Sequence, residues 1–164
     1  MTINPKSAFD KVTATEYNEL LRLAQPPFVR TTGTDTNAST TVKSHPTLTL
    51  TPDINSTYTF TAWLVVNAPA AQDFKVQWLT PASSAGWWTA KNTAQGGTSG
   101  TIFQSSITWA NPGVLEGAGG DLIYEIFGVL RTAATPGAFT MQYAPFVAGT
   151  VTVQIDSTLE LRKR

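Results

Sequence analysis

The last strand-like segment of the chain, residues 151–161, is the feature that most constrains the fold. Because side chains alternate faces along a strand, its pattern predicts one long strand with a buried face and a solvated face. A slip of one residue would bury every carboxylate of the segment, so the pattern also fixes its pairing in a covered antiparallel sheet. Ser157 is the only small polar member of the buried parity, which otherwise holds Val151, Val153, Ile155, Leu159 and Leu161.

The middle of the chain repeats this two-residue period. Apolar side chains alternate with threonines over residues 57–66 and with polar side chains over residues 73–78. Residues 122–131 are apolar on both parities, which predicts a central strand covered on both faces. Since turn signals separate many such strands and helical spacing is rare, we expect an all-β, antiparallel β-sandwich, with jelly roll as the favoured topology.

One short helix is expected near the N-terminus. Thr13 and Glu16 have the spacing of a capping box, and Val12 and Tyr17 have the spacing of a hydrophobic staple. Prolines 26 and 27 end the segment. The chain therefore divides into an arm with a short helix, residues 1–28, and a sandwich domain, residues 29–164. Apolar residues recur at helical spacing at Ala14, Tyr17, Leu20, Leu21 and Ala24.

Composition excludes several classes of partner. The 164 residues carry 11 basic and 11 acidic side chains, and only 13% are charged. Duplex nucleic acid is bound largely through phosphate neutralisation, so we expect no nucleic-acid partner. The longest apolar run, residues 62–66, is far short of the ~20 residues of a membrane span, and we expect no membrane partner. The first residues show no apolar signal region, so a secretory signal is not expected.

The residues available for catalysis are sparse. The sequence holds one histidine, His45, and no cysteine, so a serine–histidine triad or a thiolate metal site is not expected. Asp121, Glu125 and Glu116 are the only acids clustered near a strand, and Glu125 is interpreted as a hydrogen-bonded acid at a strand edge. A cell-wall hydrolase remains the enzymatic alternative. We expect no enzyme activity, no cofactor, no catalytic residue and no metal site.

Three tryptophans lie beside Gly- and Ser-rich segments: Trp87, Trp88 and Trp109. Trp87 and Trp88 are adjacent, so on a strand they point to opposite faces. Three interpretations stay open: one is core while the other shields a loop, they anchor a subunit interface, or they form a platform for a glycan.

Two blocks of the sequence carry a family resemblance. The first holds Ile3-Asn-Pro, then Val12-Thr-Ala-Thr-Glu-Tyr-Asn-Glu-Leu and Phe28-Val-Arg-Thr-Thr. The second holds Gly128-Val-Leu-Arg, Gly137-Ala-Phe-Thr-Met-Gln-Tyr-Ala and the segment from Gly149 to Arg162. With the Tyr58-Thr-Phe strand, these blocks resemble the β-sandwich domain of actinobacteriophage capsid decoration proteins, head fibres and minor tail proteins.

The resemblance implies a bacteriophage structural protein located on the exterior of the capsid. It also implies a homotrimer whose other partner is the major capsid protein. The chain has no shaft repeat, which favours a capsid decoration protein that stabilises the shell. The alternative is a tail or head-fibre module that binds a receptor or a host-surface glycan. We expect the subunit or capsid interface to include Val12, Tyr17, Leu20, Leu21, Ala24 and Phe28, although the helix alternatively plugs one end of its own sandwich.

Overall fold

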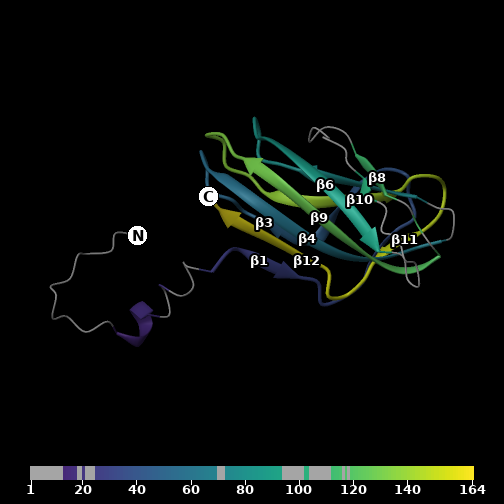
Figure 1. The fold of residues 1–164 in the computed structure, drawn as a ribbon, viewed down its shortest axis with the longest axis horizontal. Helices are drawn as coiled ribbons and strands as arrows, with labels where there is room; N and C mark the ends of the chain where they lie inside the picture. Colours follow the sequence, from purple (N-terminus) through teal and green to yellow (C-terminus); the bar gives the residue numbers. More distant parts are fainter. Residues whose placement is uncertain are drawn as a thin grey trace.

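The protein is an antiparallel β-sandwich, as the alternating sequence pattern predicts (Figure 1). The structure is a computed structural model that describes residues 13–17, 20, 25–69, 73–93, 102–103, 112–115, 117 and 119–164. One helical turn precedes the sheets, at residues 14–17, with residue 20 also helical. The predicted fold class is therefore confirmed.

Two sheets form the layers of the sandwich. The larger, 8-stranded sheet has the order β1-β12-β4-β9-β6-β7, with β11 paired to β4 and β2 paired to β11. The 4-stranded sheet has the order β3-β10-β5-β8. The strands span β1 Phe28–Arg30, β2 Asp35–Asn37, β3 Lys43–Leu50, β4 Thr57–Ala68, β5 Phe74–Leu79, β6 Ala85–Thr93, β7 Ile102–Phe103, β8 Gly113–Leu115, β9 Gly120–Arg131, β10 Phe139–Pro145, β11 Val151–Val153 and β12 Thr158–Lys163.

The pairing is nested along the chain. β1 pairs with β12, β3 with β10, β4 with β9 and β5 with β8, while β6 and β7 are inserted between the two innermost strands. The longest pairing joins β4 and β9 over 12 residues of each strand, which run side by side in Figure 1. This nested order favours the jelly-roll topology, which stays a prediction.

Aromatic side chains from both sheets meet in the core. Trp78 of β5 stacks on Phe139 of β10 with ring centroids 4.7 Å apart. Phe60 of β4 meets both rings edge to face, at 4.8 and 4.9 Å, and Trp88 of β6 lies 6.4 Å from Trp78. All four side chains are buried. Offset and edge-to-face contacts of this kind stabilise beyond the area they bury, so the aromatic core joins the two layers.

The final segment is two strands, not the single long strand that its alternation predicts. Val153 pairs with Val66 and Thr158 pairs with Trp63, so residues 154–157 face only residues 64 and 65. Asp156 adopts a left-handed conformation with φ of 65° in this turn. Ile155, expected on the buried face, is 50% exposed. The turn at residues 154–157 therefore has two residues more than the segment of β4 that it faces. Because this difference is even, the alternation before and after the turn stays in phase and conceals the break.

Ser157 and Thr31 hold this turn against β4. The buried Ser157 hydroxyl accepts the Val65 N–H at 3.0 Å and donates to the Gln154 carbonyl at 3.0 Å. The Thr31 hydroxyl accepts the Ser157 N–H at 3.0 Å and donates to the same carbonyl at 2.9 Å. These hydroxyls satisfy backbone groups that the interrupted ladder leaves unpaired. The single polar residue of the apolar parity therefore marks the position of the break.

The strand predicted to be covered on both faces is central but covered on one face only. β9 lies between β4 and β6, as expected. Leu122, Tyr124 and Ile126 are buried against the smaller sheet, whereas Ile123 and Phe127 are exposed. The second layer packs on one side of the larger sheet, and no described element packs on the other. The prediction of double coverage is thus wrong.

The capping box predicted at the helix start is confirmed. The Thr13 N–H donates to the Glu16 carboxylate at 2.9 Å, and the Glu16 N–H donates to the Thr13 hydroxyl at 3.2 Å. Tyr17 completes the first turn through its N–H to the Thr13 carbonyl at 2.9 Å. Val12, the other half of the predicted staple, lies outside the described residues.

Removal of the Ser157 hydroxyl is expected to destabilise the protein. Ser157→Ala leaves the Val65 N–H without its acceptor, a loss of about 1–3 kcal/mol in the free energy of unfolding. Urea denaturation measures it. Ser44→Ala is the matched control, because Ser44 is exposed on β3 and should change stability by less than about 0.5 kcal/mol. Equal effects in the two variants would contradict the assigned role of Ser157.

Candidate interaction surface

The outer face of the larger sheet carries exposed aromatic side chains. Trp63 of β4 is 47% exposed, Phe127 of β9 is 38% exposed and Trp87 of β6 is 51% exposed. Each of the three has a buried residue next to it in sequence, so the strand period places its own side chain outside. Ile123 of β9 is exposed on the same face. The larger sheet therefore has apolar side chains on both faces.

The register places the three aromatic residues on a diagonal across neighbouring strands. Trp63 pairs with Glu125 of β9, and Phe127 follows two residues later on that strand. Trp87 pairs with Val129, two residues beyond Phe127. Each step crosses one strand and advances two residues, about 8 Å from the strand spacing and rise. We call Trp63, Phe127 and Trp87 the aromatic diagonal.

The charged side chains of this face are partnered within the chain. Lys91 lies 2.8 Å from Glu125, beside the aromatic diagonal, and Arg162 pairs with Glu160. Arg30 lies 3.5 Å from Asp156 at the rim. Asp121 accepts hydrogen bonds from Asn67 and Gln154, and Arg131 lies over the Trp87 ring, 5.5 Å from its centroid. The face carries no excess of either sign: its basic residues are Arg30, Lys91, Arg131 and Arg162, and its acidic residues are Asp121, Glu125, Asp156 and Glu160.

The outer face of the smaller sheet is different. Along β10 and its neighbours it presents mainly short polar side chains, such as the Thr49–Thr140 hydroxyl pair at 2.7 Å and the Gln142–Ser44 pair at 3.0 Å. Leu79 and Val114 are its exposed large apolar residues. The exposed aromatic rings of the sandwich strands thus gather on the larger sheet, with Phe28 on its edge strand β1.

The structure places the sequence-predicted residues in three groups. Trp87 and Trp88 point to opposite faces, as adjacency predicts, with Trp88 in the aromatic core. Tyr17, Leu20 and Phe28 are exposed, and Phe28 belongs to β1. Those outside the described residues are Val12, Leu21, Ala24 and Trp109.

Sequence reasoning missed Trp63, Ile123 and Phe127 as surface residues. Because β9 was expected to be covered on both faces, Ile123 and Phe127 were expected to be buried. The available signal was Trp63, which lies among threonines on the polar parity of its strand. Its register partner is Glu125. The ion pair to Lys91 agrees with the predicted partnered acid, but the predicted edge position is wrong, because β9 is paired with β4 and β6 on both sides of Glu125.

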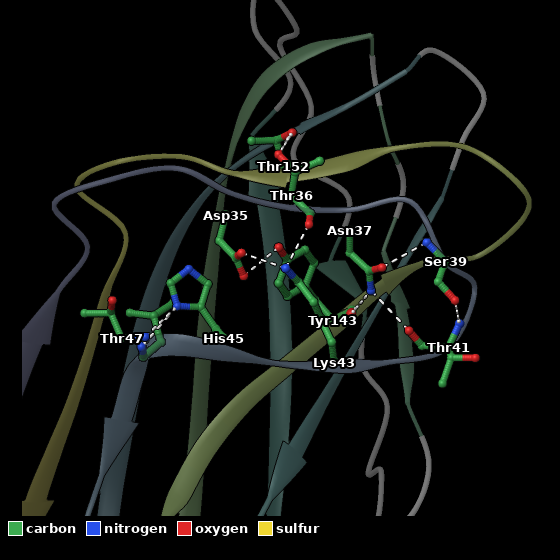
Figure 2. Close-up of polar contacts among 11 residues, drawn as sticks. Asp35, Thr36, Asn37, Ser39, Thr41, Lys43, His45, Thr47, Tyr143 and Thr152 are labelled. Atoms are coloured by element: carbon green, nitrogen blue, oxygen red, sulfur yellow. Dashed lines mark hydrogen bonds and ion pairs between the residues drawn. The ribbon is translucent and has the colours of Figure 1, made fainter.

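A cluster of polar contacts surrounds Asp35, Thr36 and Asn37 of β2 (Figure 2). The Tyr143 hydroxyl donates to the Asp35 carboxylate at 2.9 Å, and Lys43 donates to the same carboxylate at 2.6 Å. The Asn37 side-chain amide donates to the carbonyls of Tyr143 and Thr41 at 2.9 and 3.1 Å. Burial, followed by the bond to Asp35, raises the pKa of Tyr143 far above its ordinary value. These contacts attach β2 to β3 and β10.

His45 caps an irregularity in β3. Thr140 of β10 pairs with Thr49 of β3, and Gln142 pairs with Ser44. Two residues of β10 therefore correspond to five of β3, so β3 bulges between these pairs. The His45 Nδ1 accepts the N–H groups of Thr47 and Leu48 at 3.1 and 3.2 Å (Figure 2).

An acceptor Nδ1 requires the neutral imidazole with its proton on Nε2. Nε2 is buried and has no hydrogen-bond partner among the described residues. Burial lowers the pKa of His45 from its ordinary 6.5, an effect that Asp35 opposes and Lys43 reinforces. His45 therefore fulfils a structural role in the neutral form.

The ionisable side chains considered above for catalysis have partners within the chain. Asp35 is engaged by Tyr143 and Lys43, Glu125 is engaged by Lys91, and His45 is engaged by its own strand. Within the described residues, no three His, Asp or Glu side chains are grouped to hold a metal ion. The described helical residues include no segment long and apolar enough to cross a membrane.

Comparison with protein-family models, with curated proteins and with solved structures finds no match to this chain.

The His45 cap predicts a pH-dependent stability. Because the folded pKa lies below 6.5, the unfolded chain binds the proton first, and stability is complete above pH 6.5 and is lost as the pH falls through the folded pKa. His45→Asn keeps a side-chain acceptor for the Thr47 N–H but does not titrate. Between pH 7.5 and 5.5 we expect the wild type to lose more unfolding free energy than the variant.

Urea denaturation at the two pH values measures this difference, and the carboxylates common to both proteins cancel in the comparison. An equal loss in the wild type and His45→Asn would show that His45 does not stay neutral in the folded protein.

Proposed function

We propose that the protein is a non-enzymatic structural protein of a bacteriophage virion. In this proposal it is a capsid decoration protein that binds the exterior of the assembled shell as a homotrimer and stabilises it. The support is the sequence resemblance described above together with a sandwich whose nested strand order is typical of viral capsid and lectin domains. A fold alone does not specify a function, so the function is inferred from the residues proposed for attachment.

The observation that carries the proposal is the exposure of apolar side chains in the N-terminal segment. Tyr17 and Leu20 of the helix and Phe28 of β1 are all more than 45% exposed. An isolated helix of a few turns is marginal in water, so its apolar side chains need a surface to dock on. In the proposed assembly that surface is a neighbouring subunit or the major capsid protein. The sequence assigns Val12, Leu21 and Ala24 to the same interface.

Stabilisation of the shell would follow from mass action. A protein that binds the assembled shell but not its separated subunits lowers the free energy of the assembled state, by an amount that grows with its concentration over Kd. No bond to the capsid has to be strong individually, because many copies act together on one shell.

A tail or head fibre is the alternative location, with a receptor or glycan as the partner. The exposed Trp87 beside Arg131 is the observation that favours it. Electron microscopy of intact particles with labelled protein separates the two locations, since decoration covers the shell and a fibre occupies one or a few positions.

Heating of particles tests the stabilising role. Particles carrying the protein are expected to release their genome at a higher temperature than particles from which it is absent. Fluorescence of a DNA-binding dye measures the release. Re-addition of the purified protein is the control and should restore the higher temperature. Equal release temperatures would contradict the stabilising role.

A charged helix tests the attachment role. Tyr17→Asp with Leu20→Asp places unpaired carboxylates in the proposed contact, where burial of a charge without a partner costs several kcal/mol. We expect circular dichroism to show a folded sandwich, while light scattering shows a single chain and binding to shells is lost. Ile155→Asp is the matched control, because Ile155 is 50% exposed in the β11–β12 turn. Retained binding by the helix variant would contradict the assignment.

A further inference from the structure

We infer that the outer face of the larger sheet is a binding platform for a neutral glycan, with Trp63, Phe127 and Trp87 as its stacking residues. This surface differs from the N-terminal segment to which capsid attachment is assigned above. The inference rests on the glycan-binding alternative proposed above, names its site and the class of glycan, and can be tested on the isolated protein without a capsid.

The geometry of the aromatic diagonal suits an extended chain of sugars. The three side chains stand on three adjacent, hydrogen-bonded strands, β4, β9 and β6, and their Cα atoms span about 17 Å in two steps. A pyranose ring has an apolar face of C–H groups, and an aromatic side chain offers a rigid apolar surface that retains few rotamers to lose. A line of such rings contacts successive sugars and not one sugar alone.

The Trp87 indole has a cationic neighbour that restrains it. The Arg131 guanidinium lies over the ring, 5.5 Å from its centroid. A cation over an aromatic face is attracted by the ring quadrupole, so the indole is held before any ligand arrives. Trp87 remains 51% exposed beside this guanidinium, which supplies donors for a sugar hydroxyl.

The charge of the face indicates that its partner is neutral. Lys91 and Glu125 pair with each other at 2.8 Å, and the basic and acidic residues of the face balance. A nucleic acid also stacks on aromatic side chains, but it requires an excess of basic residues along its backbone. An acidic polysaccharide has the same requirement. A neutral glycan does not.

The same charges argue against a second copy of the chain as the occupant. Lys91 and Glu125 lie next to the aromatic diagonal, and Arg131 lies at its end. A close-packed protein contact would remove these groups from water, which is costly, and the cores of protein interfaces are depleted in charge. Sugar hydroxyls donate and accept hydrogen bonds, so a glycan satisfies these groups while its C–H face covers the rings.

An array of immobilised neutral oligosaccharides (glucans, mannans and galactans), with their uronic-acid and sialylated counterparts, tests the inference on the full chain. We expect retention on neutral glycans at physiological salt. Trp63→Ala and Trp87→Ala should each weaken binding on the order of tenfold, since stacked aromatic residues act as binding hot spots. Trp63→Tyr and Trp87→Tyr should retain most of the affinity, because a phenol ring also stacks.

Phe146→Ala is the matched control. Phe146 is 49% exposed, which is close to the exposed fractions of Trp63 and Trp87. It follows β10 in the sequence and lies outside the aromatic diagonal. Its loss should leave glycan binding unchanged. Circular dichroism of each variant establishes that it is folded. If an alanine variant does not fold, the tyrosine variant at the same position is combined with Phe127→Ala and takes its place.

Three results would overturn the inference. The first is the absence of retention on every neutral glycan, or a preference for the acidic ones. The second is an equal loss of binding in Phe146→Ala. The third is a fall in mass by light scattering for Trp63→Ala or Trp87→Ala, which would make the face a subunit interface. Failure of capsid binding leaves these readouts unaffected, since no capsid is present.

Discussion

The contact between Trp78 and Phe139 of the smaller sheet and Phe60 and Trp88 of the larger one determines most of what the surface presents. Once Trp88 enters the core, the two-residue period of β6 directs Trp87 outward. The burial of neighbouring residues on β4 and β9 directs Trp63 and Phe127 outward in the same way. The aromatic diagonal is therefore a consequence of core packing in register, and a slip of one residue in either strand would exchange core and surface.

The sequence is sufficient to predict the sandwich, the helix cap and the opposite orientation of the two adjacent tryptophans. All of these depend on local spacing, which the chain carries in itself. Coverage of β9 is different, because apolar residues on both parities show only that both faces avoid charge. They do not show whether the second face meets a layer of the same chain or a partner. Trp63 on the polar parity is the residue that indicates an exposed second face.

Two buried polar residues locate the irregularities that periodicity cannot. Ser157 lies in an apolar parity and serves the turn between β11 and β12, while His45 is buried in β3 and serves its bulge. In both places the ladder leaves backbone N–H groups that need an acceptor, and a short polar side chain supplies it. The even length of the insertion before β12 hides it from any argument based on alternation. In this chain a lone polar residue on a buried parity therefore marks an irregularity that the alternation conceals.

An exposed aromatic sheet face usually invites aggregation, and the features that oppose it here also restrict what binds. The central strands β4 and β9 have both edges paired, so the face offers no backbone groups to another strand. The Lys91–Glu125 pair and Arg131 interrupt the apolar surface and retain water around it. A flat apolar partner would have to dehydrate these charges, whereas a partner with alternating C–H and hydroxyl groups would not. The face is thus unfavourable to a second sheet and favourable to a sugar chain for the same physical reason.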